Sequence, residues 1–391
     1  MVKPVPLNGE IISRSQIGHE FIWPKEDPRS QWQPSRNYEF SDDSRIRDLG
    51  RSPHFNLNTF LEKNQTLDIP SQIIELLNHN AFQFNSRKRF RKCEQWRKIV
   101  TDACEKGEPI EILILAFCVI NNPTKRVQST ELTTADDISL LHMNSIARYI
   151  SSIYSPGAVF QVISDSTFYA LPLGVTSVEA QNYLIQLQRR TKELKINNTV
   201  KVHDISDYLA NYNQFFHDRF ETWRTKFLSD PLSQNLLAEE YQRWHASMRA
   251  TLNSRRMEFS YEQLVKLFGA APNKTKEHLD YNTTVALAEY RALKAAAADT
   301  NWEKNHFPNA IRATIHAKKI PVLGLRLYPE YKLSSRLFPY HGIAVITQND
   351  DNGAEQMEIH HEITVIGNPA YTKVVDKNGL TQFYEPSKLN I

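Results

Sequence analysis

The stretch Ser155-Pro-Gly-Ala-Val-Phe-Gln-Val-Ile-Ser-Asp165 decides the fold of this chain. A Pro-Gly turn leads into a continuous apolar run over residues 158–163, which is typical of a strand buried on both faces of a parallel sheet. Asp165 and Ser166 follow where the apolar run stops. Open α/β sheets bind their ligands at the carboxyl ends of such strands, so Asp165 is a candidate functional acid. The structural alternative is that Asp165 only caps a turn through Ser166 and Thr167.

The segments around this strand alternate between strand and helix patterns. Residues 110–117 form a second continuous apolar run, and apolar residues recur at helical spacing over residues 136–154. Further along the chain, the pattern predicts a helix, a strand and a helix over residues 178–194, 199–203 and 205–227. This order predicts an α/β fold with a Rossmann-like parallel sheet flanked by helices.

The last part of the chain has a different pattern. Residues 232–302 are mostly helical in composition and include an alanine-rich run, whereas short strand patterns separated by turn signals follow Phe307. We expect strands at 310–315, 322–327, 342–346 and 357–365 and around Tyr371 and Phe383. The predicted domains are an extended N-terminal arm (1–65), a Rossmann-like α/β body with a helical insertion (66–305) and a β-rich C-terminal part packed on the body (306–391).

Bulk composition excludes several classes of protein. The 391 residues are 41% hydrophobic, which suits one large core or two moderate ones. Lys and Arg total 47 against 44 acidic residues, and this near-balance gives no argument for nucleic acid or an anionic membrane. Three cysteines without CxxC spacing favour a reducing compartment. No apolar run approaches the roughly 20 residues of a membrane span, so we expect a cytoplasmic protein.

A second motif, Phe307-Pro-Asn-Ala-Ile-Arg-Ala-Thr-Ile-His316, predicts an anion-binding face. Arg312, Thr314 and His316 alternate with apolar residues, so a strand would place them together on one side. Arg312 is a candidate for binding a phosphate or carboxylate, and His316 for moving a proton near neutral pH. A solvent-facing strand would alternate in the same way. His341, after Pro339-Tyr340, is a third candidate, with a structural histidine as the alternative.

Two further groups of residues have weaker arguments. Lys125 and Arg126, on the polar segment that follows Phe117, are candidate anion contacts or simply exposed loop charges. His360-His361-Glu362, together with the histidines named above, would suit a divalent cation. Adjacent strand residues point to opposite faces, however, so we expect no metal site. The sequence contains no HExxH, P-loop or GxGxxG fingerprint.

Together these motifs resemble the pyoverdine/dityrosine biosynthesis family, whose best-known members are isocyanide synthases. The resemblance spans about residues 107–345. Its landmarks follow the family's order: Gly107-Glu-Pro-Ile-Glu-Ile-Leu-Ile-Leu-Ala-Phe117, Ile153-Tyr-Ser-Pro-Gly-Ala158, Ser164-Asp165, Gly174-Val175, Ile311-Arg-Ala-Thr-Ile-His316 and Pro339-Tyr-His341. Several positions depart from the family pattern, including Arg-Ala-Thr-Ile-His for Arg-Leu-Ser-Ile-His and Pro-Tyr-His for Pro-Trp-His. Two departures change the chemistry most, because Ser166 stands where the motif has glycine and Ile120 where it has lysine.

The resemblance implies an enzyme that condenses the amine of tyrosine or tryptophan with ribulose 5-phosphate and releases an isocyanide. It implies no metal or nicotinamide cofactor, and a pathway iron/2-oxoglutarate oxygenase as a possible partner. On this hypothesis Asp165, His316 and His341 are catalytic, and Arg312, Ser166, Lys125 and Arg126 contact the substrates. Two alternatives remain open: a repurposed or non-catalytic relative that binds a small amino-acid or sugar-phosphate ligand, and a metal-dependent enzyme.

Overall fold

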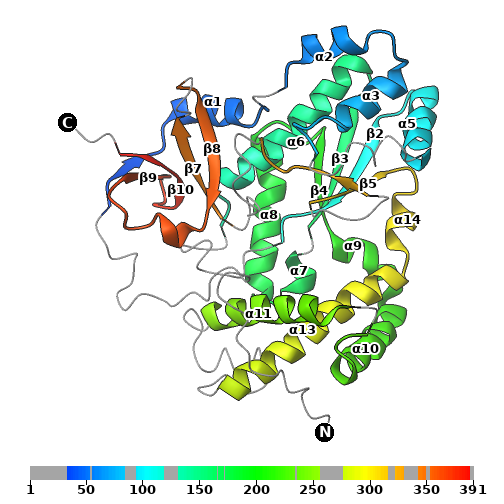
Figure 1. The fold of residues 1–391 in the computed structure, drawn as a ribbon, viewed down its shortest axis with the longest axis vertical. Coiled ribbons are helices and arrows are strands. Elements are labelled where there is room, and N and C mark those ends of the chain that lie inside the picture. The colour runs from blue at the N-terminus through cyan, green and yellow to red at the C-terminus, as the bar shows by residue number, and fades with distance from the viewer. Residues whose placement is uncertain are drawn as a thin grey trace.

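The computed structural model describes residues 33–52, 55–83, 94–118, 131–164, 166–170, 172–233, 236–255, 276–315, 322–329, 342–348 and 353–387. Within these residues the strands form two five-stranded sheets. One sheet is parallel and flanked by helices, and the other is mixed and lies at the C-terminal end of the chain (Figure 1). This arrangement confirms the predicted fold class.

The parallel sheet has the strand order β4-β3-β2-β5-β6. The central strand β2 pairs with β3 along its whole length and with β5 on its other side, so that Ile112 lies opposite both Phe160 and Ile311. The pairs β3·β4 and β5·β6 are parallel as well. The strands are β2 (Ile110–Leu115), β3 (Ala158–Ser164), β4 (Val200–Asp204), β5 (Ile311–Thr314) and β6 (Leu323–Gly324).

Helices cover the two faces of this sheet unequally. The connections β2→β3→β4 run in one direction, so right-handed crossovers place α6 (Thr134–Ile153) and α8 (Ser177–Glu193) on one face. Their apolar residues join α3 (Ile69–Leu77) and α5 (Glu94–Lys106) in the main core. The return to β5 passes over the opposite face, where α9 (Ile205–Leu209) and α14 (Trp302–His306) form a smaller core.

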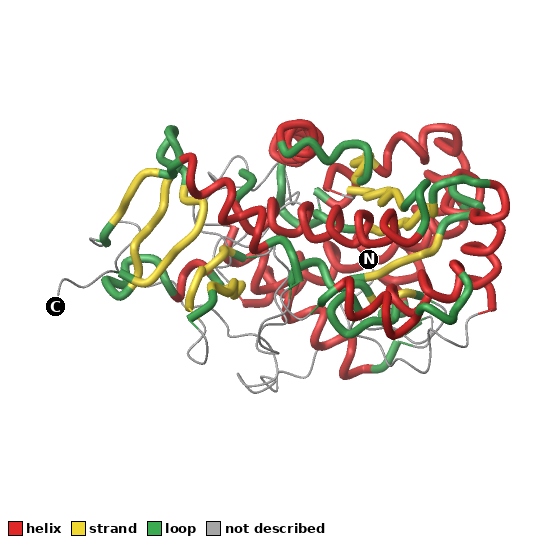
Figure 2. The backbone as a smooth tube through the Cα atoms, turned by 90° about the horizontal axis from the view of Figure 1, so that it is seen from above, coloured by secondary structure: helices red, strands yellow, loops and turns green. Residues whose placement is uncertain are grey.

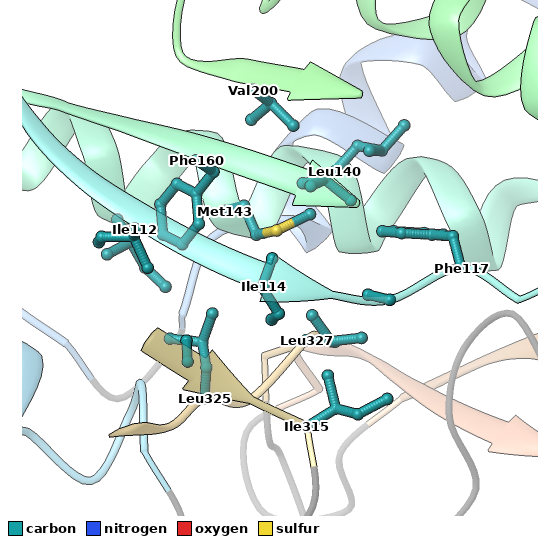
Figure 3. Close-up of a cluster of buried hydrophobic side chains, with 14 of the residues drawn as sticks. Ile112, Ile114, Phe117, Leu140, Met143, Phe160, Val200, Ile315, Leu325 and Leu327 are labelled. Carbon is teal, nitrogen blue, oxygen red and sulfur yellow. The ribbon is translucent and has the colours of Figure 1, made fainter. Parts of the chain in front are cut away.

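The main core lies between β2, β3 and the long helix α6. Figure 3 shows Phe160 and Met143 beside each other in this layer, with Ile112 and Ile114 from the central strand. All four side chains are fully buried. The same core continues into the C-terminal sheet, because α6 also packs against β7 and β10.

The Pro-Gly turn of the first motif has a specific structural reason. Gly157 has a φ of +70°, a conformation that residues with a Cβ rarely adopt. A Cβ atom at this position would also collide with the Ser151 side chain on the last turns of α6. The glycine therefore permits the close turn from α6 into β3.

Helices from the connection between β4 and β5 form a separate group at the bottom of Figure 1. They are α10 (Asn213–Ser229), α11 (Ala238–Arg255) and α13 (Lys276–Asp299). Asp299 fixes α10 against α13, because it accepts hydrogen bonds from Arg219 at 2.6 Å and from Trp223 at 2.8 Å. Helices α11 and α13 lie within residues 232–302, where the composition predicts mostly helical structure.

The C-terminal sheet includes β1, a strand from the beginning of the described residues. Its order is β1-β9-β10-β7-β8, and β1 pairs in parallel with β9. Its strands are β1 (Ser35–Asn37), β7 (Ile343–Gln348), β8 (Glu355–His360), β9 (Tyr371–Val375) and β10 (Thr381–Pro386). Figure 2 shows this sheet at one end of the molecule.

An ion-pair network joins β1 and α1 (Phe40–Leu49) to this sheet. Arg36 bridges Asp42 at 2.9 Å and Glu385 at 2.6 Å, and Arg45 bridges Glu385 at 2.7 Å and Glu355 at 2.7 Å. Both guanidinium groups lie over the buried ring of Phe383. Since these charges are partly shielded from water, the network contributes more than an exposed ion pair would.

The structure corrects the expected arm and the placement of two strands. The described part of residues 1–65 is not extended, because it contains β1, α1 and α2 (Leu57–Asn64). A three-residue strand offers no periodicity, which explains why the pattern does not reveal it. Strands β5 and β6 follow residue 306 but belong to the parallel sheet. Strand β8 ends at His360, and a 3-10 turn follows at Glu362–Thr364.

No helix in the described ranges has the length and apolar character that crossing a bilayer requires.

The buried His142 on α6 gives a prediction about stability and pH. Its Nδ1 lies 3.4 Å from the Gly50 carbonyl, and its Nε2 has no hydrogen-bond partner among the described residues. Burial lowers the pKa of His142 from its ordinary 6.5 to about 4. Between these values the unfolded chain binds a proton that the folded protein excludes, so the free energy of unfolding falls as pH falls from 6.5 to 4. The slope approaches about 1.4 kcal/mol per pH unit for this one proton.

We therefore expect His142→Gln to flatten this part of the pH profile, measured by urea unfolding at several pH values. His217→Gln, on an exposed position of α10, is the control and should keep the wild-type slope. An unchanged slope in His142→Gln would contradict the assignment.

Candidate functional site at the carboxyl edge of the parallel sheet

The carboxyl edge of the parallel sheet collects the ends of the strands that the sequence singled out. The strand order reverses between β2 and β5, and such a switch point is where open α/β sheets bind ligands. At this edge, β2 continues into Phe117, β3 ends at Ser164, β4 at Asp204 and β5 at Thr314. The candidate site is built from these ends and from the segments that follow them.

Phe117, just beyond β2, has a strained backbone. Its φ is +62°, and its side chain is fully buried. A left-handed conformation costs a residue with a Cβ about 1–2 kcal/mol, so the surrounding packing must hold it in place. Strain of this kind concentrates at functional sites, where the structure fixes a conformation that the chain would not choose alone.

A buried hydroxyl ties this strained residue to the neighbouring strand. Ser164, the last residue of β3, donates a hydrogen bond of 3.0 Å to the Phe117 carbonyl. Ser164 is fully buried, so the bond is shielded from water. The bond fixes the ends of β2 and β3 relative to each other directly before Asp165.

A second polar cluster fixes the end of β4. The carboxylate of Asp204 accepts hydrogen bonds from the Thr167 hydroxyl at 2.7 and 2.8 Å. It also accepts bonds from the backbone N–H and the hydroxyl of Ser206, both at 3.0 Å. Asp204 therefore caps α9 and at the same time holds α7 (Ser166–Tyr169), the short helix that follows β3.

The helices at this edge carry their own carboxylates at their N-termini. Asp136 accepts a 2.8 Å bond from the Thr133 N–H at the start of α6 and a 3.0 Å bond from the Tyr183 hydroxyl. Glu179 accepts a 2.7 Å bond from the Thr176 N–H at the start of α8. A helix N-terminus often binds a phosphate, but these carboxylates already satisfy that positive end. An anionic ligand at this edge therefore needs cationic side chains.

Arg312 shows the alternation that the sequence predicts. Arg312 is opposite Leu113 and shares its face of the sheet with Thr314, whereas Ile311, Ala313 and Ile315 point into the main core. The guanidinium forms an ion pair of 2.8 Å with Glu303 of α14, and it also donates to the Ala313 carbonyl. Arg312 is therefore a half-buried, preorganised cation with a carboxylate neighbour.

The other predicted site residues are not tested by the structure. Asp165, His316, His341, Lys125, Arg126 and Ile120 lie outside the described residues, as does the side chain of Ser166. The backbone of Ser166 is described and begins α7. Their roles remain predictions.

Of the residues considered for a metal, His360 and Glu362 lie in and directly after β8 of the other sheet, whereas His316 and His341 are outside the described residues. His360 lies at the end of β8 with its Nε2 2.9 Å from Glu358, and Glu362 is buried beside the Tyr384 hydroxyl at 3.1 Å. The described ranges contain no group of His, Cys, Asp and Glu side chains arranged to hold a metal ion.

The sequence analysis missed a polar row on the α9 face of the parallel sheet. Gln161 donates a 2.7 Å bond to Glu111 and lies 2.9 Å from the Nε2 of His203, so the row crosses β2, β3 and β4. Burial lowers the pKa of His203, which favours the neutral ring. Tyr208 packs against this histidine. The sequence does contain a signal for this row, because each of the three strand patterns includes a polar residue that belongs to it: Glu111, Gln161 or His203.

The fold is that of a Rossmann-like α/β protein, and its candidate site lies at the switch point of the parallel sheet. The family model of the pyoverdine/dityrosine biosynthesis proteins matches residues 100–364, and the chain belongs to this family.

Two characterised relatives and one solved structure agree with this assignment. An L-tyrosine isonitrile synthase of Xenorhabdus nematophila is 21% identical over 298 residues, which cover 72% of this chain and 83% of the relative. An L-tyrosine isonitrile synthase of Pseudomonas aeruginosa is 24% identical over 278 residues, or 69% of this chain and 81% of the relative. The crystal structure of the PvcA protein from Pseudomonas aeruginosa superposes on this structure with a TM-score of 0.59 and a sequence identity of 20%. The superposition covers 82% of this chain and 100% of that protein, so the two proteins have the same fold.

The strain at Phe117 predicts an inverted order of stability between two variants. Phe117→Ala and Phe117→Gly both remove the buried ring, which costs about 3–5 kcal/mol. Glycine normally destabilises a strand or helix relative to alanine, but at a φ of +62° it relieves the strain. We therefore expect Phe117→Gly to be more stable than Phe117→Ala by about 1 kcal/mol in urea unfolding.

The matched control is Phe160 on β3, which is equally buried and has no positive φ. There, Phe160→Ala should be the more stable variant of the pair. The same order at both positions would contradict a strained Phe117.

Proposed function

We propose that this chain is an isocyanide synthase that condenses the amine of tyrosine or tryptophan with the ketone of ribulose 5-phosphate. The observation that carries the proposal is the family match over residues 100–364, with isonitrile synthases aligned over most of their own length. Isonitrile and isocyanide name the same group. The strained, hydrogen-bonded ends of β2 and β3 support a reaction site at this edge of the sheet.

The reaction requires proton transfers and a binding site for the sugar phosphate. We assign the proton transfers to Asp165 and His316, with His341 orienting the substrate or sharing that work. We assign anion binding to Arg312 together with Lys125 and Arg126. The helix N-termini of α6, α8 and α9 support this second assignment, because their own carboxylates leave the phosphate to cationic side chains.

The two departures from the family motif have different consequences. Ser166 begins α7, and a helical backbone needs no glycine, so the fold accommodates the serine. Ile120 is the more serious change, because isoleucine neither neutralises a phosphate nor forms an imine as a lysine does. We propose that Lys125 or Arg126 supplies the missing positive charge.

The direct test of the function is incubation of the purified protein with each aromatic amino acid and ribulose 5-phosphate. We expect an isocyanide that a tetrazine traps and mass spectrometry detects. Asp165→Asn keeps the volume of the side chain and removes its proton-transfer charge, so it should abolish product without a change in unfolding midpoint. Near-normal turnover in Asp165→Asn would show that Asp165 is structural.

Arg312→Ala tests the anion clamp. We expect its KM for ribulose 5-phosphate to rise about tenfold or more, because a charge-assisted bond is worth about 1.5–3 kcal/mol. The matched control is Arg219→Ala, which breaks a similar half-buried ion pair, with Asp299, in the helical group. Equal effects of the two variants on KM would remove Arg312 from the phosphate site.

A repurposed ligand-binding protein is the second candidate, and the absent motif lysine at Ile120 favours it. Ile120→Lys separates the two cases. Isocyanide formation that appears only in Ile120→Lys would identify a decayed synthase, whereas activity in the unmodified chain would dismiss this candidate.

A further inference from the structure

The cluster around Asp204 does more than cap a helix. The Asp204 side chain is almost completely buried and lies at the carboxyl end of β4. It accepts bonds from two different elements, the Thr167 hydroxyl of α7 and the Ser206 N–H and hydroxyl of α9. An N-cap needs only the bond from the backbone N–H. The bidentate contact with Thr167 is therefore additional to the cap.

Helix α7 is too short to hold its own position. It has four residues, so it makes little internal hydrogen bonding and depends on tertiary contacts. Phe168 packs against Phe216 of α10 with ring centroids 5.4 Å apart, and Tyr169 packs against Tyr290 of α13 at 4.7 Å. These ring contacts act on the side of α7 that faces the helical group. The hydrogen bond from Thr167 to Asp204 is a polar contact that joins α7 to the end of β4.

The placement of α7 matters because of what precedes it. Ser166 begins this helix and Ser164 ends β3, so only one residue, Asp165, joins the two elements. Ser164 is fixed on one side by its bond to the Phe117 carbonyl. A displacement of α7 therefore moves Ser166 relative to Ser164.

We propose that Asp204 is a positioning residue that, through the Thr167 hydroxyl, fixes α7 and with it the reacting group at the β3–α7 junction. The hydrogen bonds of Asp204 support its role in holding α7. The effect of this placement on turnover rests on the proposed function. Misplacement of a reacting group by about 1 Å can lower a rate by 10²-fold, whereas substrate binding by other residues need not change.

Thr167→Val removes the hydroxyl and keeps the shape of the side chain and the cap on α9. We expect kcat for isocyanide formation to fall at least about tenfold with KM for both substrates little changed. Thr167→Ser restores the hydroxyl and should restore kcat. Ser206→Ala is the matched control, because it removes the 3.0 Å hydroxyl bond to the same carboxylate and the longer 3.3 Å contact with the Thr167 hydroxyl. It keeps the 2.7 Å bond from Thr167 to Asp204, so it should keep the wild-type kcat.

Hydrogen exchange gives a second readout that does not depend on activity. The Val175 N–H bonds to the Ala170 carbonyl at 2.8 Å directly after α7. Peptides over residues 166–175 should exchange faster in Thr167→Val than in the wild type or in Ser206→Ala, while peptides of β3 and α8 stay unchanged.

The outcomes separate the two proposals. A Thr167→Val protein with wild-type kcat and wild-type exchange at residues 166–175 would overturn the role of Asp204. If the unmodified chain makes no isocyanide, the proposed function fails, and the exchange rates alone decide whether Asp204 holds α7. A fall in kcat in both Thr167→Ser and Ser206→Ala would also refute the proposal. It would show that any substitution near Asp204 lowers kcat, whether or not the Thr167 hydroxyl is present.

Discussion

The pairing of β2 with β3 on one side and β5 on the other is the constraint on which the rest of the structure depends. These strands lie at distant points of the sequence, and the parallel register places Ile112 between Phe160 and Ile311. Parallel pairing brings the carboxyl ends of all three strands to one edge. The ends of β3 and β5, at Ser164 and Thr314, therefore lie at the same edge, although about 150 residues of helices and loops separate them.

This constraint also explains the unequal faces of the sheet. The crossovers that leave β2 in one direction build the thick layer of α6 and α8, and the long return to β5 crosses the other face with short helices. The polar row of Glu111, Gln161 and His203 lies on this second face. Charged and polar side chains are tolerated within a central sheet only where the covering layer is incomplete or where they satisfy one another. Both conditions hold for this row.

The sequence predicted the parts of the fold that have a strong local signal. Long apolar runs identified β2 and β3, and helical spacing identified α6 and α8 to within a few residues. Strand β1 escaped prediction because its three residues carry no period, and its pairing with β9 joins opposite ends of the chain. Such a pairing depends on tertiary contacts that no local pattern encodes.

The candidate site was predictable in a similar, partial way. The apolar run over residues 158–163 does end at the carboxyl edge of the sheet, and alternation correctly placed Arg312 and Thr314 on one face. The strain at Phe117 and the partner of Arg312 were not predictable, because a backbone torsion and an ion pair with Glu303 arise only when the elements pack.

The carboxylates that cap the helices at this edge affect which groups are available to bind an anionic ligand. In many Rossmann-like proteins a helix N-terminus binds phosphate through backbone N–H groups, at little entropic cost because the backbone is already fixed. Here Asp136, Glu179 and Asp204 each accept one of the backbone N–H groups and place a negative charge at the helix N-terminus. Recognition of an anion then falls to long cationic side chains, which must be ordered on binding. A cation already held by a neighbour, as Arg312 is held by Glu303, pays less of that ordering entropy than a solvated lysine.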